Sequence, residues 1–401
     1  MKPWRLAYLV THPIQYQSPL LRTIAAQPEI ALTTFFCTDF SLKAYMDPGF
    51  SRSIAWDVPL TDGYDHEFLP VWGSKDSLSF VHPWIHGLRK RLIAGEFDAL
   101  WVHGWGQLSH ILAIFGARRL GIKVLLRGEA GLHLPRYGPF KQWLKDRFLH
   151  LLFARIDGFL AIGQLNRDFY LRYGVPVERV FTMPYAVDNA FFQEQVRRVV
   201  AGREVLRREL RLEPGRPIFL YAGKMIERKR AEDLLEAFIR LSPDGHREPR
   251  AYLLFIGDGD LRHSLERRVA QLGWGAIRFL GFKNQTELPA YYDLCDVFVL
   301  PSVREPWGLV VNEVMNAGRA VIVSDEVGCH SDLVKDDVNG YVFKAGDVTS
   351  LEAALSKVLN DPSRCSMMGL KGLAIINAFS FQEDIIGLRQ AISSVMERHE
   401  I

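Results

Sequence analysis

The segment DVFVLPSVREPWGLVVNEVMNAGRAVIVSD, residues 296–325, decides the fold class. Residues 297–300 and 320–324 are continuous apolar runs, which predict strands that are buried on both faces. Between them, residues 309–318 have the apolar spacing of a helix and end in glycine. Strand, helix and strand in this order predict two parallel strands joined by a crossover helix. The segment also places two acids, Glu305 and Glu313, in a largely apolar run, which raises a question about function.

The same alternation extends through both halves of the chain. Apolar runs alternate with amphipathic ones on either side of residues 189–215, which are charged and lack a strand-like run. We therefore predict an α/β fold with two doubly wound, Rossmann-like parallel-sheet domains facing a cleft, since ligands bind beyond the carboxyl ends of such strands. The expected domain spans are 1–195 and 216–380, joined by a linker at 196–215. Within the first domain, long loops are expected at 40–80 and a helix at 83–95.

Composition limits the classes of function. With 401 residues the chain is too long for one ordinary core, and a formal charge of +3 gives no indication of nucleic-acid binding. Its four cysteines lie far apart and lack metal-ligand spacing, which favours a reduced, cytoplasmic setting. The N-terminal apolar run is short and ends in His12-Pro13, so we expect a first strand rather than a signal peptide. No apolar run predicts a membrane-spanning helix.

The stretch YAGKMIERKR, residues 221–230, is a candidate anion site. An expected strand ends at Gly223, a helix follows soon after, and the loop between them carries Lys224, Arg228, Lys229 and Arg230. A glycine turn, cations and a helix N-terminus together favour phosphate. The Walker spacing is absent, so an ATPase is not inferred. The alternative is a set of solvated surface charges.

The two acids of the opening segment suit a ligand with hydroxyl groups at both ends. Glu305 lies in the loop after the strand at 297–300, and Glu313 lies inside the following helix. Ionised carboxylates accept hydrogen bonds strongly from hydroxyl groups, and a sugar nucleotide has these on its sugar and on its ribose. The alternative is that Glu313 is an exposed helix residue and that Glu305 pairs with Arg304.

A family resemblance favours the first interpretation. Residues 279–325, FLGFKNQTELPAYYDLCDVFVLPSVREPWGLVVNEVMNAGRAVIVSD, follow a long family signature. On this signature, residues 216–347 resemble the nucleotide-sugar domain of retaining glycosyltransferases of family 4, which have the glycosyltransferase B fold. The resemblance implies that Glu305 contacts the donor sugar and that Glu313 contacts the ribose. It also implies that residues 381–401 form a helix that returns to the first, acceptor-binding domain.

The resemblance implies a diphosphate site at Gly223, Lys224 and Lys229. Lys224 stands where relatives have arginine, which keeps the charge but loses the planar fork of donors. Gly328-Cys329 stands where relatives have a glycine pair. The other donor-binding residues implied are Phe282 and Lys283 beside the nucleobase, and Trp307, Gly308 and Leu309, whose backbone amides would meet phosphate or sugar.

The first half resembles the family more loosely, mainly over residues 95–190. His103 lies at the end of an expected strand, and Arg127 and Glu129 follow the next, where relatives commonly have a histidine near the reacting carbon. Arg127 and Glu129 are expected acceptor-site groups, and His103 an expected catalytic one, with a packed core histidine as the alternative. The expected catalytic residues are Glu305, Lys229, Lys224 and His103.

The loop THPIQYQSP, residues 11–19, replaces a glycine-rich loop of the relatives. His12, Gln15 and Tyr16 are expected acceptor contacts, and loop packing is the alternative. In the turn MPYAVD, Tyr185 and Ala186 replace the Asn and Gly of the family.

The segment 136–156 is a basic and aromatic amphipathic helix, a pattern found at membrane surfaces and also in helices that only cover a sheet. Its basic residues are Arg136, Lys141, Lys145 and Arg147, and its large apolar residues include Phe140, Trp143, Leu144, Phe148 and Leu151.

The sequence thus predicts a retaining glycosyltransferase that moves a sugar from a uridine- or guanosine-linked donor to a glycan, lipid-linked or small-molecule hydroxyl acceptor, in polysaccharide, lipid-linked glycan or glycoconjugate synthesis. We expect no cofactor and no metal, because no Asp-x-Asp element suited to a divalent ion is present. The expected location is cytoplasmic, with peripheral contact at the inner membrane face and no nucleic-acid partner. A sugar-nucleotide epimerase and a non-catalytic sugar-nucleotide-binding subunit are the alternatives.

Overall fold

The computed structural model describes residues 2–73, 78–134, 138–242 and 248–397. The chain divides into two compact units. The first contains Met1–Tyr45, Val58–Val187 and Ser380–Ile401, and the second contains Met46–Asp57 and Asp188–Phe379. The division therefore falls a few residues before the boundary expected at 195, and a short N-terminal segment belongs to the second unit.

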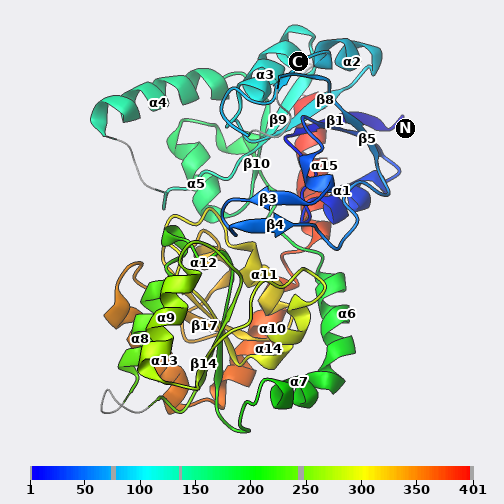
Figure 1. Cartoon of the computed structure of the whole chain (residues 1–401). Helices are drawn as coiled ribbons and strands as arrows, with labels where there is room; N and C mark the ends of the chain where they lie inside the picture. The colour runs from blue at the N-terminus through cyan, green and yellow to red at the C-terminus, as the bar shows by residue number, and fades with distance from the viewer. Residues whose placement is uncertain (1, 74–77, 135–137, 243–247, 398–401) are drawn as a thin grey trace. The chain divides into compact units, whose positions relative to one another are not determined.

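The first unit is built on a seven-stranded parallel sheet with the order β11-β10-β9-β8-β1-β2-β5 (Figure 1). Its strands are β1 (Trp4–Val10), β2 (Ile30–Phe36), β5 (Asp65–Phe68), β8 (Ala99–His103), β9 (Lys123–Arg127), β10 (Gly158–Ala161) and β11 (Val180–Thr182). Its helices are α1 (Ser18–Ala25), α2 (Leu88–Ala94), α3 (Leu108–Arg119), α4 (Pro139–Phe153), α5 (Gln164–Arg172) and α15 (Phe381–Glu397).

Alternating side chains of the central strand β1 fill a core on each face of this sheet. Leu6 and Tyr8 pack with residues of α1 and α15, whereas Ala7 and Leu9 pack with residues of α2, α3, α4 and α5. Successive side chains of a strand point to opposite faces, so a strand covered on both sides is apolar throughout. This explains the continuous apolar runs in the sequence.

The second unit is built on a six-stranded parallel sheet with the order β14-β13-β12-β15-β16-β17. Its strands are β12 (Ile218–Ala222), β13 (Tyr252–Ile256), β14 (Ile277–Phe279), β15 (Val297–Leu300), β16 (Ala320–Ser324) and β17 (Gly340–Phe343). Its helices are α6 (Asn189–Val199), α7 (Arg203–Glu209), α8 (Ala231–Arg240), α9 (Arg262–Leu272), α10 (Leu288–Leu294), α11 (Leu309–Met315), α12 (His330–Leu333), α13 (Val348–Asn360) and α14 (Arg364–Ile376). In Figure 1, α8, α9 and α13 lie on one side of the sheet and α10, α11 and α14 on the other.

Both sheets confirm the predicted doubly wound α/β class, but two local expectations were wrong. The stretch expected to be loops contains β5 and two short two-stranded sheets, β3 (Tyr45–Asp47) with β4 (Arg52–Ile54), and β6 (Val71–Trp72) with β7 (Trp84–Ile85). The helix expected from residue 83 begins only at Leu88, because Gly87 has a φ of 78°, a left-handed conformation that a right-handed helix cannot pass through. Among the described residues, no helix has both the length and the apolar composition needed to cross a bilayer.

Candidate functional site

In the second unit the order of the strands across the sheet reverses between β12 and β15. The strands β13 and β14 continue on one side of β12, and β15 lies beside β12 on the other. Ligands of open parallel sheets bind beyond the carboxyl ends of the strands at such a switch point. The loop with Gly223, Lys224 and Lys229 follows β12, and the loop with Glu305 follows β15. The sheet order therefore brings together two motifs that are far apart in the sequence.

Glu305 lies between two cations from the β12 loop. Its side chain is 11% exposed, and its Oε2 accepts hydrogen bonds from Lys229 Nζ at 2.5 Å and from Arg228 Nη1 at 3.0 Å. The backbone holds the loop in place, because Glu305 N–H donates to the carbonyl of Glu326 and the Glu305 carbonyl accepts from Gly328 N–H. Because both side chains of the Lys229–Glu305 ion pair are largely shielded from solvent and bonded directly, the pair holds the two charged groups in one arrangement.

Lys224, by contrast, is paired with Asp47 of β3. Its Nζ lies 2.9 and 3.0 Å from the two carboxylate oxygens and 5.0 Å from the centre of the Phe50 ring. The Phe50 ring also contacts the ring of Phe282 at 5.1 Å between centroids, and Arg52 lies over the same Phe282 ring. The segment 46–57 thus covers part of the expected diphosphate and nucleobase region, which the sequence analysis did not foresee.

Glu313 is half-buried on α11 and hydrogen-bonded within the second unit, rather than exposed. The hydroxyl of Tyr292 donates to Glu313 Oε2 at 2.6 Å. Burial raises the pKa of Glu313 to about 7, against the opposing effect of the Tyr292 hydrogen bond. The alternative of an exposed helix residue is therefore wrong.

The loop after β15 is fixed by its backbone and by one buried indole. Trp307 is 3% exposed and its Nε1 donates to Asn312 Oδ1 at 2.9 Å, so this side chain belongs to the core. Gly308 has a φ of 95°, and a Cβ there would lie 2.9 Å from Val327, so glycine is required before Leu309 begins α11. Cys329 N–H donates to the Trp307 carbonyl, and the Cys329 side chain is buried.

Lys283 lies at the start of the segment that follows Phe282. Its Nζ is 3.2 Å from Glu287 Oε1 and 5.4 Å from the ring centre of Tyr291. Both expected nucleobase residues are half-buried, so each has surface available to a ligand.

In the first unit the switch point lies between β1 and β8, and a cluster of polar side chains surrounds it. Glu129, after β9, accepts hydrogen bonds from the hydroxyls of Tyr185 and, at 3.5 Å, Tyr16. His103, the last residue of β8, has its Nε2 3.4 Å from the Tyr185 hydroxyl and 3.9 Å from Glu129 Oε1. Gln17 Nε2 lies 3.0 Å from the same ring nitrogen.

The electrostatics of this cluster favour an ionised carboxylate with neutral phenols around it. Burial alone would raise the pKa of Glu129, but the nearby His103 and the hydrogen bond from Tyr185 outweigh it and lower the pKa. Burial raises the pKa of Tyr185 and of Tyr16, and Glu129 adds to both shifts, so each phenol stays a donor. Glu129, His103 and Tyr16 were expected at this site from the sequence, whereas Gln17 was not; Tyr185 was expected only as a departure from the family.

The three other expected acceptor residues are His12, Gln15 and Arg127, and each has surroundings of its own. His12 packs against the Phe40 ring at 4.5 Å and its Nδ1 is 2.9 Å from Thr11 Oγ1; burial lowers its pKa to about 4, so it is neutral at pH 7. Gln15 is half-buried in the same loop. The expectation that Arg127 contacts the acceptor was wrong, because its side chain is only 2% exposed.

The Arg127 guanidinium serves to hold the turn that carries Tyr185. It pairs with Asp384 of α15 at 2.9 Å and donates to the carbonyls of Met183 and Pro184 at 3.0 and 2.8 Å. It also lies 4.8 Å from the Tyr185 ring centre. The residue therefore supports the Glu129 cluster from behind and does not reach a ligand.

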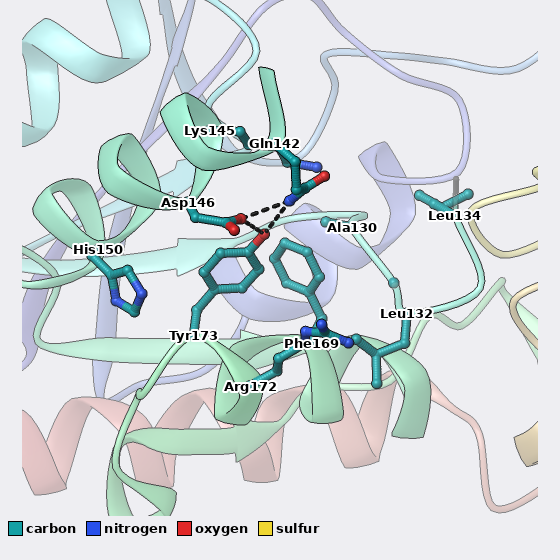
Figure 2. A pocket seen from close by; sticks show the side chains of 11 residues that line it. Ala130, Leu132, Leu134, Gln142, Lys145, Asp146, His150, Phe169, Arg172 and Tyr173 are labelled. Atoms are coloured by element: carbon teal, nitrogen blue, oxygen red, sulfur yellow. Dashed lines mark hydrogen bonds between the residues drawn. The ribbon is translucent and has the colours of Figure 1, made fainter. Parts of the chain in front are cut away.

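A pocket of about 170 Å³ lies beside this cluster, between α4, α5 and the loop that continues from Glu129 (Figure 2). Asp146 accepts hydrogen bonds from the Tyr173 hydroxyl at 2.7 Å and from Gln142 Nε2 at 2.6 Å, and these lower its pKa. Leu132, Phe169 and other residues complete the wall. Sites for drug-sized ligands measure about 300–1,000 Å³, so this pocket has room only for a small group.

Comparison with known proteins gives matches over both units. The model "Glycosyl transferases group 1" matches residues 202–373, and the model "Glycosyl transferase 4-like domain" matches residues 59–186, together about three quarters of the chain. A Bacillus subtilis (strain 168) protein, named provisionally as the glycosyltransferase EpsD, is 25% identical over 90% of this chain and 96% of its own length.

Solved structures share the fold. Alr3699/HepE of Anabaena in complex with UDP has a TM-score of 0.71 at 15% identity and covers 98% of this chain and 100% of its own. Sucrose-phosphate synthase of Thermosynechococcus elongatus has a TM-score of 0.73 at 19% identity, with coverage of 98% and 100%. At these identities the similarity concerns the fold.

Proposed function

Because this chain belongs to the group 1 glycosyltransferases, we propose that it transfers a sugar, with retained anomeric configuration, from a nucleotide-diphosphate sugar to a hydroxyl acceptor. The observation that carries this proposal is the Lys229–Glu305 pair at the switch point of the second unit. It offers a cation for the departing diphosphate and, beside it, a carboxylate for the hydroxyl groups of the sugar.

The chemistry of the step explains why both groups are needed. When the bond between the sugar and the diphosphate breaks, the leaving group gains negative charge and the sugar becomes oxocarbenium-like. Cations fixed beside the diphosphate stabilise this state more than the ground state. In the proposed arrangement Lys229 and Lys224 contact the diphosphate, and Glu305 orients Lys229 and accepts hydrogen bonds from sugar hydroxyls.

The nucleoside end of the donor is assigned to residues of the same unit. Glu313 would accept hydrogen bonds from the ribose, and Phe282 with Lys283 would line the base. That HepE was solved with UDP supports a uridine nucleotide. No resident metal is proposed: among the described residues, no group of three or more His, Cys, Asp and Glu side chains is placed to hold one.

The Glu129 cluster is assigned to the acceptor. An ionised carboxylate flanked by the phenols of Tyr16 and Tyr185 can orient an acceptor hydroxyl, and His103 lies close enough to share its proton network. The acceptor class remains a glycan, a lipid-linked glycan or a small hydroxyl compound.

The function is tested by following both products of the donor. Full-length protein is mixed with a panel of UDP- and GDP-linked α-hexoses, nucleotide release is measured, and the first-formed anomer of the freed sugar is identified by NMR. We expect UDP release from at least one donor and the α anomer first. The proposal would be overturned if the donor were converted to its epimer without nucleotide release, or if the β anomer of the freed sugar formed first. Removal of divalent metal ions with EDTA should leave the rate of UDP release unchanged.

We expect Glu313→Gln to weaken UDP binding by about 10- to 100-fold, since a hydrogen bond to a charged group contributes about 1.5–3 kcal/mol. The change is measured by calorimetry at pH 8, where Glu313, with its pKa of about 7, is ionised. The exposed Glu209→Gln of α7 serves as the matched control and should bind UDP as the wild type does.

The same variant has an opposite effect on stability. The raised pKa of Glu313 means that its stabilising contribution is full below its usual pKa of 4.5 and is lost as the pH rises through 7. Gln cannot ionise, so urea unfolding of the variant should lose less stability than wild type between pH 5 and pH 8. Equal losses in both proteins would contradict the raised pKa of Glu313.

We expect Asp47→Asn to tighten UDP binding about five- to tenfold, because it releases Lys224 from a partly buried ion pair while the Asn oxygen still accepts from the backbone N–H of Gly49. The control is Asp57→Asn, which removes the same charge from the same segment at a residue bonded to Thr286. If both variants changed UDP affinity equally, the change in net charge alone would explain the result. Weaker binding in Asp47→Asn would show that Asp47 positions Lys224 for the ligand.

A further inference from the structure

Helix α4 is apolar on two opposite sides. Its inner side packs Leu149, Leu152 and Phe153 into the core of the first unit. Its outer side exposes a second apolar stripe at helical spacing. The outer stripe consists of Phe140 (71% exposed), Trp143 (53%), Leu144 (48%), Phe148 (40%) and Leu151 (66%). One helix face needs only one apolar stripe to cover a sheet, so packing within the unit does not account for the second.

The charges of α4 differ between the two sides, with Lys145 and Asp146 both at the inner pocket. Lys141 and Arg147 are exposed beside the outer stripe, and the Arg147 guanidinium lies 5.7 Å from the Trp143 ring centre. The helix carries a single acid, Asp146, and Figure 2 shows it on the inner side, bonded to Gln142 and Tyr173 in the pocket. The outer side of α4 therefore combines large apolar side chains with positive charge and has no acid. Arg136, another basic residue expected for this face, lies outside the described residues.

We propose that the outer stripe of α4 docks on the surface of an anionic lipid bilayer, with the helix lying in the plane of the interface. Aromatic and aliphatic side chains would enter the boundary between head groups and acyl chains, and Lys141 and Arg147 would reach the lipid phosphates. The helix has 15 residues, which is too short to span the bilayer. This inference does not depend on the proposed reaction, since it uses no residue of the two candidate sites.

Charge decides between a bilayer and a second copy of the chain. In a twofold-symmetric dimer the same patch meets itself, so the cations beside one stripe would face those of the other. An anionic bilayer instead supplies the opposite charge over the whole length of the stripe.

The test is co-sedimentation of the full chain with vesicles of phosphatidylcholine alone and of phosphatidylcholine mixed with phosphatidylglycerol. We expect binding to the mixed vesicles that weakens as salt is raised, and little binding to the neutral ones. Lys141→Gln and Arg147→Gln should each weaken binding about fivefold. The triple variant Phe140→Ser, Trp143→Ser, Leu151→Ser should lose it, and its thermal unfolding should match the wild type because these side chains are exposed.

The matched control is Met367→Ser with Leu370→Ser on α14, which removes two equally exposed apolar side chains from the second unit. This control should bind vesicles as the wild type does. The proposal is overturned if the wild type ignores the anionic vesicles, or if the control loses as much binding as the triple variant. It is also overturned if light scattering finds a wild-type dimer that the triple variant abolishes while vesicle binding is unchanged, because the stripe would then be a subunit interface.

Discussion

Lys229→Met should slow nucleotide release from the sugar donor by about 10²–10³-fold, the usual loss when one fixed donor is removed from a developing negative charge. Lys229 is the cation closest to Glu305, at 2.5 Å, and its side chain is only 12% exposed, so its charge acts where little water screens it. Methionine keeps the length and apolar character of the side chain and removes only the charge. The measurement is the initial rate of UDP release under donor saturation.

Two further variants make this result specific. Lys335→Met removes an exposed lysine from the same unit and should leave the rate unchanged. Glu305→Gln should also slow release, and the double variant Lys229→Met, Glu305→Gln should be little slower than the worse single one, because residues that act as a pair are not additive. Additive losses, or a Lys229→Met rate within threefold of wild type, would contradict the role assigned to the pair.

The second-unit site could be predicted in outline because its signals are local. Each motif follows a recognisable strand, and the switch-point rule says which loops meet once the strand order is known. The sequence therefore placed Lys229 and Glu305 in one site. It did not identify Lys229 as the direct partner of Glu305. Arg304 is the neighbour of Glu305 in the sequence, whereas Lys229 comes close only because β12 and β15 are adjacent in the sheet.

The features that the sequence could not predict depend on contacts between distant segments. Asp47 reaches Lys224 from 177 residues away, and Arg127 reaches Asp384 across 257. No periodicity or motif encodes such a pairing. A buried arginine at the end of a strand has the same sequence signal as an arginine that binds a ligand, which is why Arg127 was expected in the acceptor site. Its partners separate the two cases: Asp384 of α15 and the carbonyls of Met183 and Pro184.

Asp384→Ala should destabilise the first unit by about 3–5 kcal/mol, because it leaves the charge of Arg127 buried without its partner. Both side chains are at most 2% exposed, and the guanidinium would keep only the carbonyls of Met183 and Pro184. For a unit of this size, each kcal/mol lowers the melting temperature by about 2–4 °C, so a loss of about 6–20 °C is expected by calorimetry. The turn that carries Tyr185 depends on the same guanidinium, so nucleotide binding by the second unit should be unaffected while sugar transfer weakens.

A pair of apolar replacements separates the charge from the packing. The double variant Arg127→Met, Asp384→Leu removes both charges and keeps most of the volume, and such swaps of buried ion pairs are often neutral or stabilising. We expect it to be clearly more stable than Asp384→Ala, although it too loses the hydrogen bonds to the 183–185 turn and should transfer sugar poorly. If the double variant is less stable than the single one, the buried packing of Arg127 rather than its unpaired charge holds α15 to the sheet. If Asp384→Ala costs less than about 1 kcal/mol, within the range of an exposed ion pair, then water reaches the guanidinium and the pair does not anchor Tyr185.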